Sequence, residues 1–231
     1  MLALFPEGFE ESERGQELVL SAYTDARGED RMAAAFGEVT VTDVPADWVE
    51  RWKRFHRPVS AGGLWIVPPW EDPPRGADSV LIDPGRAFGT GAHPTTRLSL
   101  ELVSELEPGS LLDIGCGSGV LAIAAAKLGF APVIGLDSDR HAVEAARANA
   151  AANGVELELE QADARVEPLP QADIAVANVN AELVAEVAER VECALFVTSG
   201  YFEAHVPSLP RFRTIDRRTL EGWAADLHAR E

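Results

Sequence analysis

The stretch from Leu111 to Gly119 reads LLDIGCGSG and begins with an apolar run that ends where the first glycine stands. That run predicts a buried strand, and Gly115, Gly117 and Gly119 predict a turn that leads into a helix. Glycine lets the backbone approach a ligand closely, and the first turn of a helix offers unpaired N–H groups to a negative group. The stretch therefore predicts a strand, a ligand-binding loop and a helix of an α/β sheet.

The spacing of the glycines separates two kinds of nucleotide-binding loop. In the dinucleotide fingerprint G-x-G-x-x-G, a loop that starts at Gly115 would need its third glycine at position 120, which is Val120. Here the third glycine is Gly119, and the acidic Asp113 lies in the preceding strand. This form resembles class I methyltransferases, which bind S-adenosylmethionine (AdoMet). We expect Gly115 and Gly117 to contact AdoMet, and the start of the helix to face its carboxylate.

Three polar residues end or follow the later predicted strands, where the carboxyl ends of parallel strands meet. Asp137 stands 20 residues after Gly117, where a carboxylate can accept hydrogen bonds from both ribose hydroxyls, although such a residue can also cap a helix. Asp163 is placed for the adenine amine, or is simply solvated. Asn178 is the predicted catalytic residue and a further cofactor contact, because its carbonyl could hold an incoming amine; the alternative is a turn-forming Asn.

From residue 95 onward the sequence alternates between strand and helix patterns. We expect helices at 95–106, 120–128, 139–153 and 181–191, and strands at 111–114, 133–137, 155–160, 174–178, 194–198, 212–217 and 223–228. Such alternation predicts a doubly wound, Rossmann-like parallel sheet of the class I methyltransferase type. The last two strands are expected to form a closing antiparallel pair.

The N-terminal part predicts a separate organisation. Residues 1–44 are expected to form a small α+β module for substrate recognition, with strands at 17–23 and 39–44 and a helix at 31–36. Residues 45–57 predict a linker helix with an aromatic stripe, and residues 58–231 the methyltransferase domain. At the start of that domain, the apolar runs 64–70 and 79–82 flank the turn sequence EDPPRG and predict a hairpin.

Composition limits the classes of partner. The net charge of −18 disfavours direct binding to nucleic acid. The two cysteines suit neither a disulfide framework nor a metal site, and methyl transfer needs no metal. With no apolar run long enough to cross a bilayer and no secretion signal, we expect a cytoplasmic protein without membrane contact. We also expect the chain to be a monomer.

Several motifs together resemble a known family. They are DPGRAFGTGAHPTTRLSLEL at 83–102, LLDIGCGSGVLAIAAAKLG at 111–129, IGLDSD at 134–139 and DIAVANVNAEL at 173–183. They resemble the ribosomal-protein lysine methyltransferases called PrmA over about residues 48–191. The resemblance implies methylation of amines of large-subunit ribosomal protein eleven and AdoMet contacts by Thr96, Gly115, Asp137 and Asn178, with residues 88–91 forming a nearby loop. We interpret His93 as part of the loop architecture.

Some features depart from the family pattern. The N-terminal module lacks the first strand and helix of the family's small ferredoxin-like domain, and the region after residue 191 is short. The usual Asn-Ile-Leu-Ala is replaced by a stretch in which Asn180 adds an amide near Asn178. Three alternatives therefore remain: methylation of another protein or a small molecule, a non-catalytic AdoMet-binding module, and, more distantly, a nicotinamide-dependent oxidoreductase.

Overall fold

The computed structural model describes residues 10–14, 17–21, 26–37, 39–41, 57–83 and 91–231. The chain divides into two compact units, Met1–Glu50 and Arg51–Glu231. Among the described residues, none of the helices combines the length and the apolar character that a membrane span requires.

The N-terminal unit contains a strand pair and a helix. Strands β1 (Glu10–Arg14) and β2 (Glu17–Ser21) pair antiparallel, and helix α1 spans Ala26–Phe36. The sequence predicted β2 but not β1, because EESER has no apolar alternation. It also placed the start of the helix too late, since Gly28 lowers the helix propensity of the first turn. Residues 39–41 belong to no strand, contrary to the expected strand at 39–44, whose remainder lies outside the described residues. The linker helix expected at 45–57 also lies outside them, except for Arg57.

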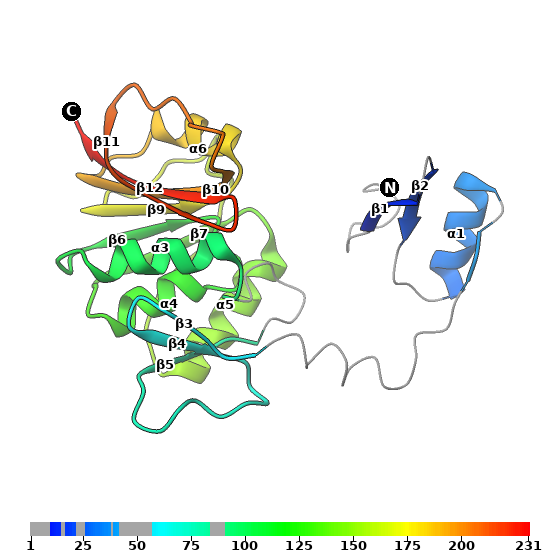
Figure 1. Cartoon of the computed structure of the whole chain (residues 1–231), viewed down its shortest axis with the longest axis horizontal. Helices are drawn as coiled ribbons and strands as arrows, with labels where there is room; N and C mark the ends of the chain where they lie inside the picture. The colour runs from blue at the N-terminus through cyan, green and yellow to red at the C-terminus, as the bar shows by residue number, and fades with distance from the viewer. Residues whose placement is uncertain (1–9, 15–16, 22–25, 38, 42–56, 84–90) are drawn as a thin grey trace. The chain divides into compact units, whose positions relative to one another are not determined.

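The second unit is built on a seven-stranded sheet (Figure 1). Its strands are β6 (Leu111–Ile114), β7 (Val133–Asp137), β8 (Glu158–Gln161), β9 (Ile174–Asn178), β10 (Leu195–Phe202), β11 (Phe212–Leu220) and β12 (Trp223–Arg230). Their order is β11-β12-β10-β9-β6-β7-β8. The five strands from β10 to β8 run parallel, and β12 lies antiparallel between β10 and β11. The predicted sheet class and the closing antiparallel pair are confirmed.

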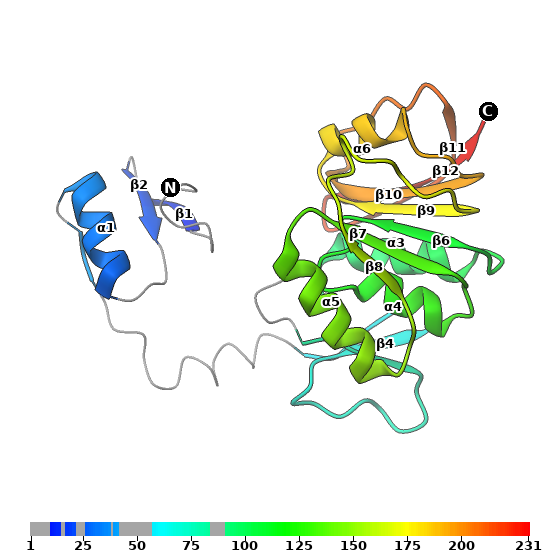
Figure 2. The ribbon, with the colours of Figure 1, turned by 180° about the vertical axis from the view of Figure 1, so that it is seen from behind.

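Helices cover both faces of this sheet. Helices α3 (Pro94–Ser104), α4 (Val120–Lys127) and α5 (Arg140–Asn153) lie together on one side, and α6 (Ala181–Ala188) lies near β10 on the other, as Figure 2 shows from behind. Alternate residues of each central strand supply the two cores: Leu111 packs with α3 and α4, whereas Leu112 and Ile114 pack with Val184 of α6. Strands β9, β6 and β7 are adjacent and parallel, so their carboxyl ends lie next to one another at one edge of the sheet, between the helices of its two faces.

A small three-stranded sheet packs against the outer side of α3, α4 and α5 (Figure 1). It consists of β3 (Val59–Ala61), β4 (Leu64–Val67) and β5 (Ser79–Leu81). The expected hairpin between the runs 64–70 and 79–82 is wrong, because β4 and β5 run parallel. The hairpin instead joins β3 to β4 through Gly62 and Gly63, whose φ values of 57° and 76° suit a tight two-residue turn. The proline-rich segment is part of the crossover that returns the chain to the start of β5.

Candidate functional site

The glycine loop between β6 and α4 is held by its own backbone. Gly115, Gly117 and Gly119 all have positive φ, of 72°, 53° and 80°. The N–H groups of Gly115 and Cys116 both donate to the carbonyl of Leu136 on β7, at 2.8 and 3.0 Å. Since these two donors are engaged, an anion would be bound by N–H groups in the first turn of α4, which an α-helix leaves without an intrahelical partner; of these, the N–H of Ala122 already donates to Asp113.

A buried carboxylate lies beneath this loop. Asp113 on β6 is 1% exposed, and its Oδ2 accepts the N–H of Ala122 in the first turn of α4 at 3.1 Å. Burial raises the pKa of Asp113 to about 7, although the hydrogen bond from Ala122 acts in the opposite direction. This side chain therefore fixes the strand to the helix. In the sequence, Asp113 serves only as a mark of the motif.

Asp137 ends β7 and completes the loop. Its Oδ2 accepts the N–H of Gly117 at 2.9 Å, and its Oδ1 accepts the N–H of Asp139 at 2.9 Å. Asp139 itself caps α5 by accepting the N–H of His141 at 2.8 Å. The helix-capping role considered for Asp137 thus falls to Asp139, whereas the carboxylate of Asp137 is directed toward the loop.

Asp163 follows β8 and forms an ion pair with Arg165. Its carboxylate accepts hydrogen bonds from the backbone N–H, Nε and Nη2 of Arg165, which lower the pKa of Asp163 to about 2. Arg190 donates to the carbonyls of Ala164 and Glu167 and so holds the same turn. Asp163 is therefore an ionised carboxylate paired with Arg165 rather than a freely solvated residue.

Thr96 and Asn178 are brought together from positions 82 residues apart. Asn178 ends β9, and its Nδ2 donates to Oγ1 of Thr96 in the first turn of α3 at 3.2 Å. Thr96 is buried, and Asn178 is half-buried. With Nδ2 directed at Thr96, the other branch of the amide, Oδ1, is available as an acceptor.

The departure at Asn180 has a structural explanation. Asn180 is the N-cap of α6, where its Oδ1 accepts the N–H of Leu183 at 2.9 Å. Asn is among the preferred residues at this position because its side chain satisfies a first-turn donor. The extra amide therefore serves the helix, which removes the observation that motivated a non-catalytic module.

A bulge in β10 brings its backbone against the segment after β9. The register shifts between Ser199 and Tyr201, and Gly200 has a φ of 101°. A Cβ on Gly200 would lie 2.1 Å from the carbonyl oxygen of Val179, and a Cβ on Gly115 would lie 2.6 Å from a methyl of Val179. Gly200 is thus required by its close approach to backbone atoms, whereas glycine at position 115 is favoured chiefly by its positive φ; Gly200 is not among the residues predicted from the sequence.

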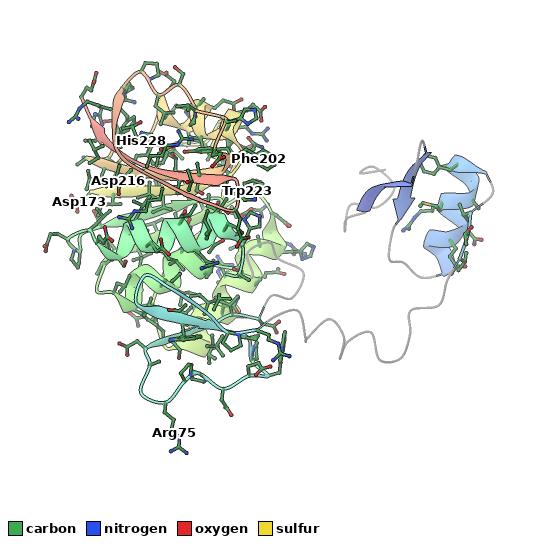
Figure 3. The ribbon with its side chains drawn as sticks, in the orientation of Figure 1. Arg75, Asp173, Phe202, Asp216, Trp223 and His228 are labelled. Carbon is green, nitrogen blue, oxygen red and sulfur yellow. The ribbon has the colours of Figure 1, made fainter. Side chains whose placement is uncertain are left out.

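Aromatic rings lie at one border of this region. His93 caps α3, with Nδ1 accepting from the N–H of Thr95, and its ring meets Trp223 edge-on at 4.7 Å between centroids. Phe202 stacks on Trp223 at 4.3 Å, and Figure 3 shows these two side chains next to each other, at the end of β10 and the start of β12. Partial burial lowers the pKa of His93. The helix cap agrees with the architectural interpretation of His93.

One cavity of about 800 Å³ joins these features. All the residues predicted for the site line it: Thr96, Gly115, Gly117, Asp137, Asp163 and Asn178. The expected loop at 88–91 is described only at Gly91. The cavity also has lining residues that the sequence analysis missed: Asp113, Leu136, Ala162, Arg165, Glu182, Glu186, Gly200 and Trp223. Of these, Gly200 carried a signal, because a lone glycine within a strand pattern indicates a bulge or a close approach. No feature of the sequence indicated that Trp223, or Glu182 and Glu186 of α6, would line the cavity.

Comparison with known proteins assigns the chain to a family. The family described as Ribosomal protein L11 methyltransferase (PrmA) matches residues 7–205. The chain belongs to the PrmA family. Among its PrmA relatives, the Ribosomal protein L11 methyltransferase of Caldicellulosiruptor saccharolyticus is 43% identical over 72% of this chain and 59% of its own length. That of Tolumonas auensis is 45% identical over 71% of this chain and 59% of its own length.

A solved structure shows the same PrmA fold. The ribosomal protein L11 methylase of Lactobacillus delbrueckii subsp. bulgaricus has a TM-score of 0.69 and 28% identity, and the match covers 76% of this chain and 99% of that one. The chain spans about three fifths of the length of the curated relatives named above. The PrmA match therefore establishes the family and the class I methyltransferase fold.

Proposed function

We propose that this chain is an AdoMet-dependent protein N-methyltransferase that methylates lysine or α-amino groups of ribosomal protein L11. The observation that carries the proposal is the convergence, on one cavity, of the glycine loop, Asp137 and the Thr96–Asn178 pair. The names of the PrmA relatives supply the substrate. Neither the geometry nor these names favour a nicotinamide cofactor.

The cavity suits AdoMet in size and chemistry. Its volume is within the range of small-molecule sites, and its lining combines apolar side chains with a few fixed polar groups. The first-turn residues Val120 and Leu121 line it, and their N–H groups suit the AdoMet carboxylate beside Gly115 and Gly117. The Asp137 carboxylate suits the ribose hydroxyls. Although both Asp137 oxygens already accept a backbone N–H, each retains a second lone pair.

The adenine end of the site is assigned to Asp163. Both of its oxygens are engaged by Arg165, but a carboxylate offers about four acceptor positions, so one remains for an exocyclic amine. The ion pair holds the carboxylate in one orientation, and Arg190 fixes the backbone of the same turn. Asp163 is thus positioned before any ligand arrives, which limits the entropy lost on binding.

Asn178 is assigned the role of orienting the acceptor amine. AdoMet, when bound, supplies a methyl group already activated by a sulfonium, so the protein contributes mainly positioning. The Nδ2 bond to Thr96 directs the other branch of the amide away from that hydroxyl. None of the described residues donates to Oδ1 of Asn178, which can therefore accept an N–H of the amine. The amine must be neutral to attack, and a lysine side chain has a pKa of about 10.4 in water. The partly apolar lining favours loss of that proton, since burial disfavours the charged form.

We also propose a separate role for each of three segments of the chain. We assign substrate recognition to residues 1–44, a linking role to residues 45–57 and methyl transfer to residues 58–231. The strand pair and helix of the first unit are compatible with a small α+β module.

The test is transfer of labelled methyl from AdoMet to ribosomal proteins from cells that lack this protein, followed by mass spectrometry. We expect label on L11, and we expect Asn178→Ala to lose most of the transfer while weakening AdoMet binding much less. Label on a different protein or on a small amine would overturn the substrate. Bound AdoMet without any label would overturn the activity, and an unchanged rate in Asn178→Ala would return that residue to a structural role.

A further inference from the structure

Two asparagines of helix α5 bind the free edge of strand β5. Asn153 Oδ1 accepts the N–H of Leu81 at 2.9 Å, and its Nδ2 donates to the carbonyl of Leu81 at 2.7 Å. One helical turn earlier, Asn149 forms the same pair with Asp83, at 3.0 and 3.5 Å. Strand β4 occupies the other edge of β5. The two amides therefore take the place of a further strand along β5 and its extension.

Asn149 makes an additional contact that the bonds of Asn153 do not repeat. Its Nδ2 also donates to the carbonyl of Ser118 at 2.9 Å, inside the glycine loop. Asn149 is 4% exposed and Ser118 is fully buried. The Nδ2 of Asn153 is directed instead to Leu81 and to the carbonyl of Asn149, at 2.8 Å. A single buried amide thus joins the glycine loop to the end of the small sheet.

The composition of α5 shows that these amides are not there for helix formation. The helix reads RHAVEAARANAAAN, and Asn is a poorer helix former than the alanines around it. Residues four apart share a face, so Asn149 and Asn153 both point at β5. A buried amide is tolerated only when its donors and acceptor are bonded, as they are at Asn149.

We infer that Asn149 is a positioning residue of the cofactor loop, an inference that rests on the proposed binding of AdoMet there. Ser118 immediately precedes Gly119, the N-cap of α4. Holding the Ser118 carbonyl fixes the peptide that leads into α4, and with it the direction of the first-turn N–H groups. When a loop samples other conformations, the apparent affinity falls in proportion to the competent fraction. Because Asn149 is hydrogen-bonded to both Ser118 and Asp83, it keeps the binding-competent fraction of the loop high.

The matched pair Asn149→Asp and Asn153→Asp tests the inference by calorimetry with AdoMet. Each variant keeps the acceptor for its strand N–H, loses the amide donor and adds one negative charge, but only Asn149→Asp withdraws a donor from Ser118. We expect AdoMet affinity to fall roughly 10-fold in Asn149→Asp and to change less than about 2-fold in Asn153→Asp. Equal losses in the two variants, or no loss in Asn149→Asp, would overturn the inference. A wild-type chain that does not bind AdoMet would overturn the proposed function as well.

Hydrogen exchange on the wild-type chain covers the case in which Asn149→Asp fails to fold. If Asn149 links the loop to Asp83, AdoMet should slow exchange of the Asp83 N–H severalfold more than that of the Leu81 N–H. The comparison is internal, because both amides are held by an α5 asparagine. Slowing within the glycine loop without slowing at Asp83 would contradict the link.

Discussion

The buried carboxylate of Asp113 gives the site a pH-dependent contribution to stability. Its pKa is raised to about 7 by burial, so between about pH 4 and pH 7 the native state binds more protons than the unfolded state. Stability from this group is therefore present at low pH and is lost as the pH rises through that interval. Exposed Asp173 has the opposite shift, because hydrogen bonds from Ser110 lower its pKa.

Asp113→Asn should remove this dependence. An amide in place of the carboxylate can still accept the N–H of Ala122 but does not titrate. We expect the free energy of unfolding of the variant, relative to wild type, to rise steadily between about pH 4 and pH 7. Urea unfolding at several pH values measures it. Asp173→Asn is the control, for which the difference should be constant above about pH 5; a flat difference for Asp113→Asn would contradict the prediction.

Asp137→Ala should weaken AdoMet binding by about one to two powers of ten, from the loss of one or two charged hydrogen bonds. The variant also releases the N–H of Gly117, so the loop loses a support. Calorimetry measures the affinity. Asp139→Ala removes a carboxylate two residues away that caps α5, and it should lower stability by about 1 kcal/mol with little effect on affinity. Equal affinity in wild type and Asp137→Ala would remove Asp137 from the site.

What could be predicted at the residue scale depended on whether the signal was local. The glycine spacing and Asp137 follow from local chain geometry, because consecutive strands and turns place them. The surroundings of Asp163 could not be foreseen in this way: its partner Arg165 is near in sequence, but Arg190, which donates to backbone carbonyls of the same turn, comes from beyond α6. Nor could Asn149, whose bonds join three segments that lie apart along the chain.

At the scale of elements, strong periodicity gave correct boundaries and weak periodicity did not. Strands β6, β7 and β9 have the bounds expected, because each is a short apolar run with a clear end. The β4–β5 hairpin was wrong, since a proline-rich turn does not distinguish a reversal from a crossover. Strand β10 was expected to end at residue 198 but continues through its bulge to Phe202. Beyond the bulge, Tyr201 is anchored by its hydroxyl, which donates to Asp226 of β12 at 2.8 Å.

Gly200→Ala should disrupt this bulge. The added Cβ would lie 2.1 Å from the Val179 carbonyl oxygen, and the backbone φ of 101° is unfavourable for alanine. We expect a loss of about 3 kcal/mol or more in the free energy of unfolding, from backbone strain and overpacking together. Gly154→Ala is the matched control: it has a φ of 65° but open space around its Cβ, so about 1 kcal/mol is expected. Urea unfolding of both variants decides, and similar losses would show that the contact with Val179 is unimportant.

At the scale of the whole molecule, the net charge of −18 bears on how the chain would meet its proposed substrate, L11. A protein that binds ribosomal RNA must carry positive charge to meet the phosphates, so its encounter with this acidic chain is electrostatically favourable. Salt screens such attraction, because the Debye length falls from about 10 Å at 0.1 M to about 3 Å at 1 M. We expect kcat/KM for L11 to fall several-fold between about 50 mM and about 500 mM salt, in initial-rate measurements. AdoMet affinity serves as the internal control, because its contacts lie within a cavity and are screened less. A kcat/KM that does not change with salt would show that the acidic surface takes no part in the encounter, and would leave solubility as the role of the charge.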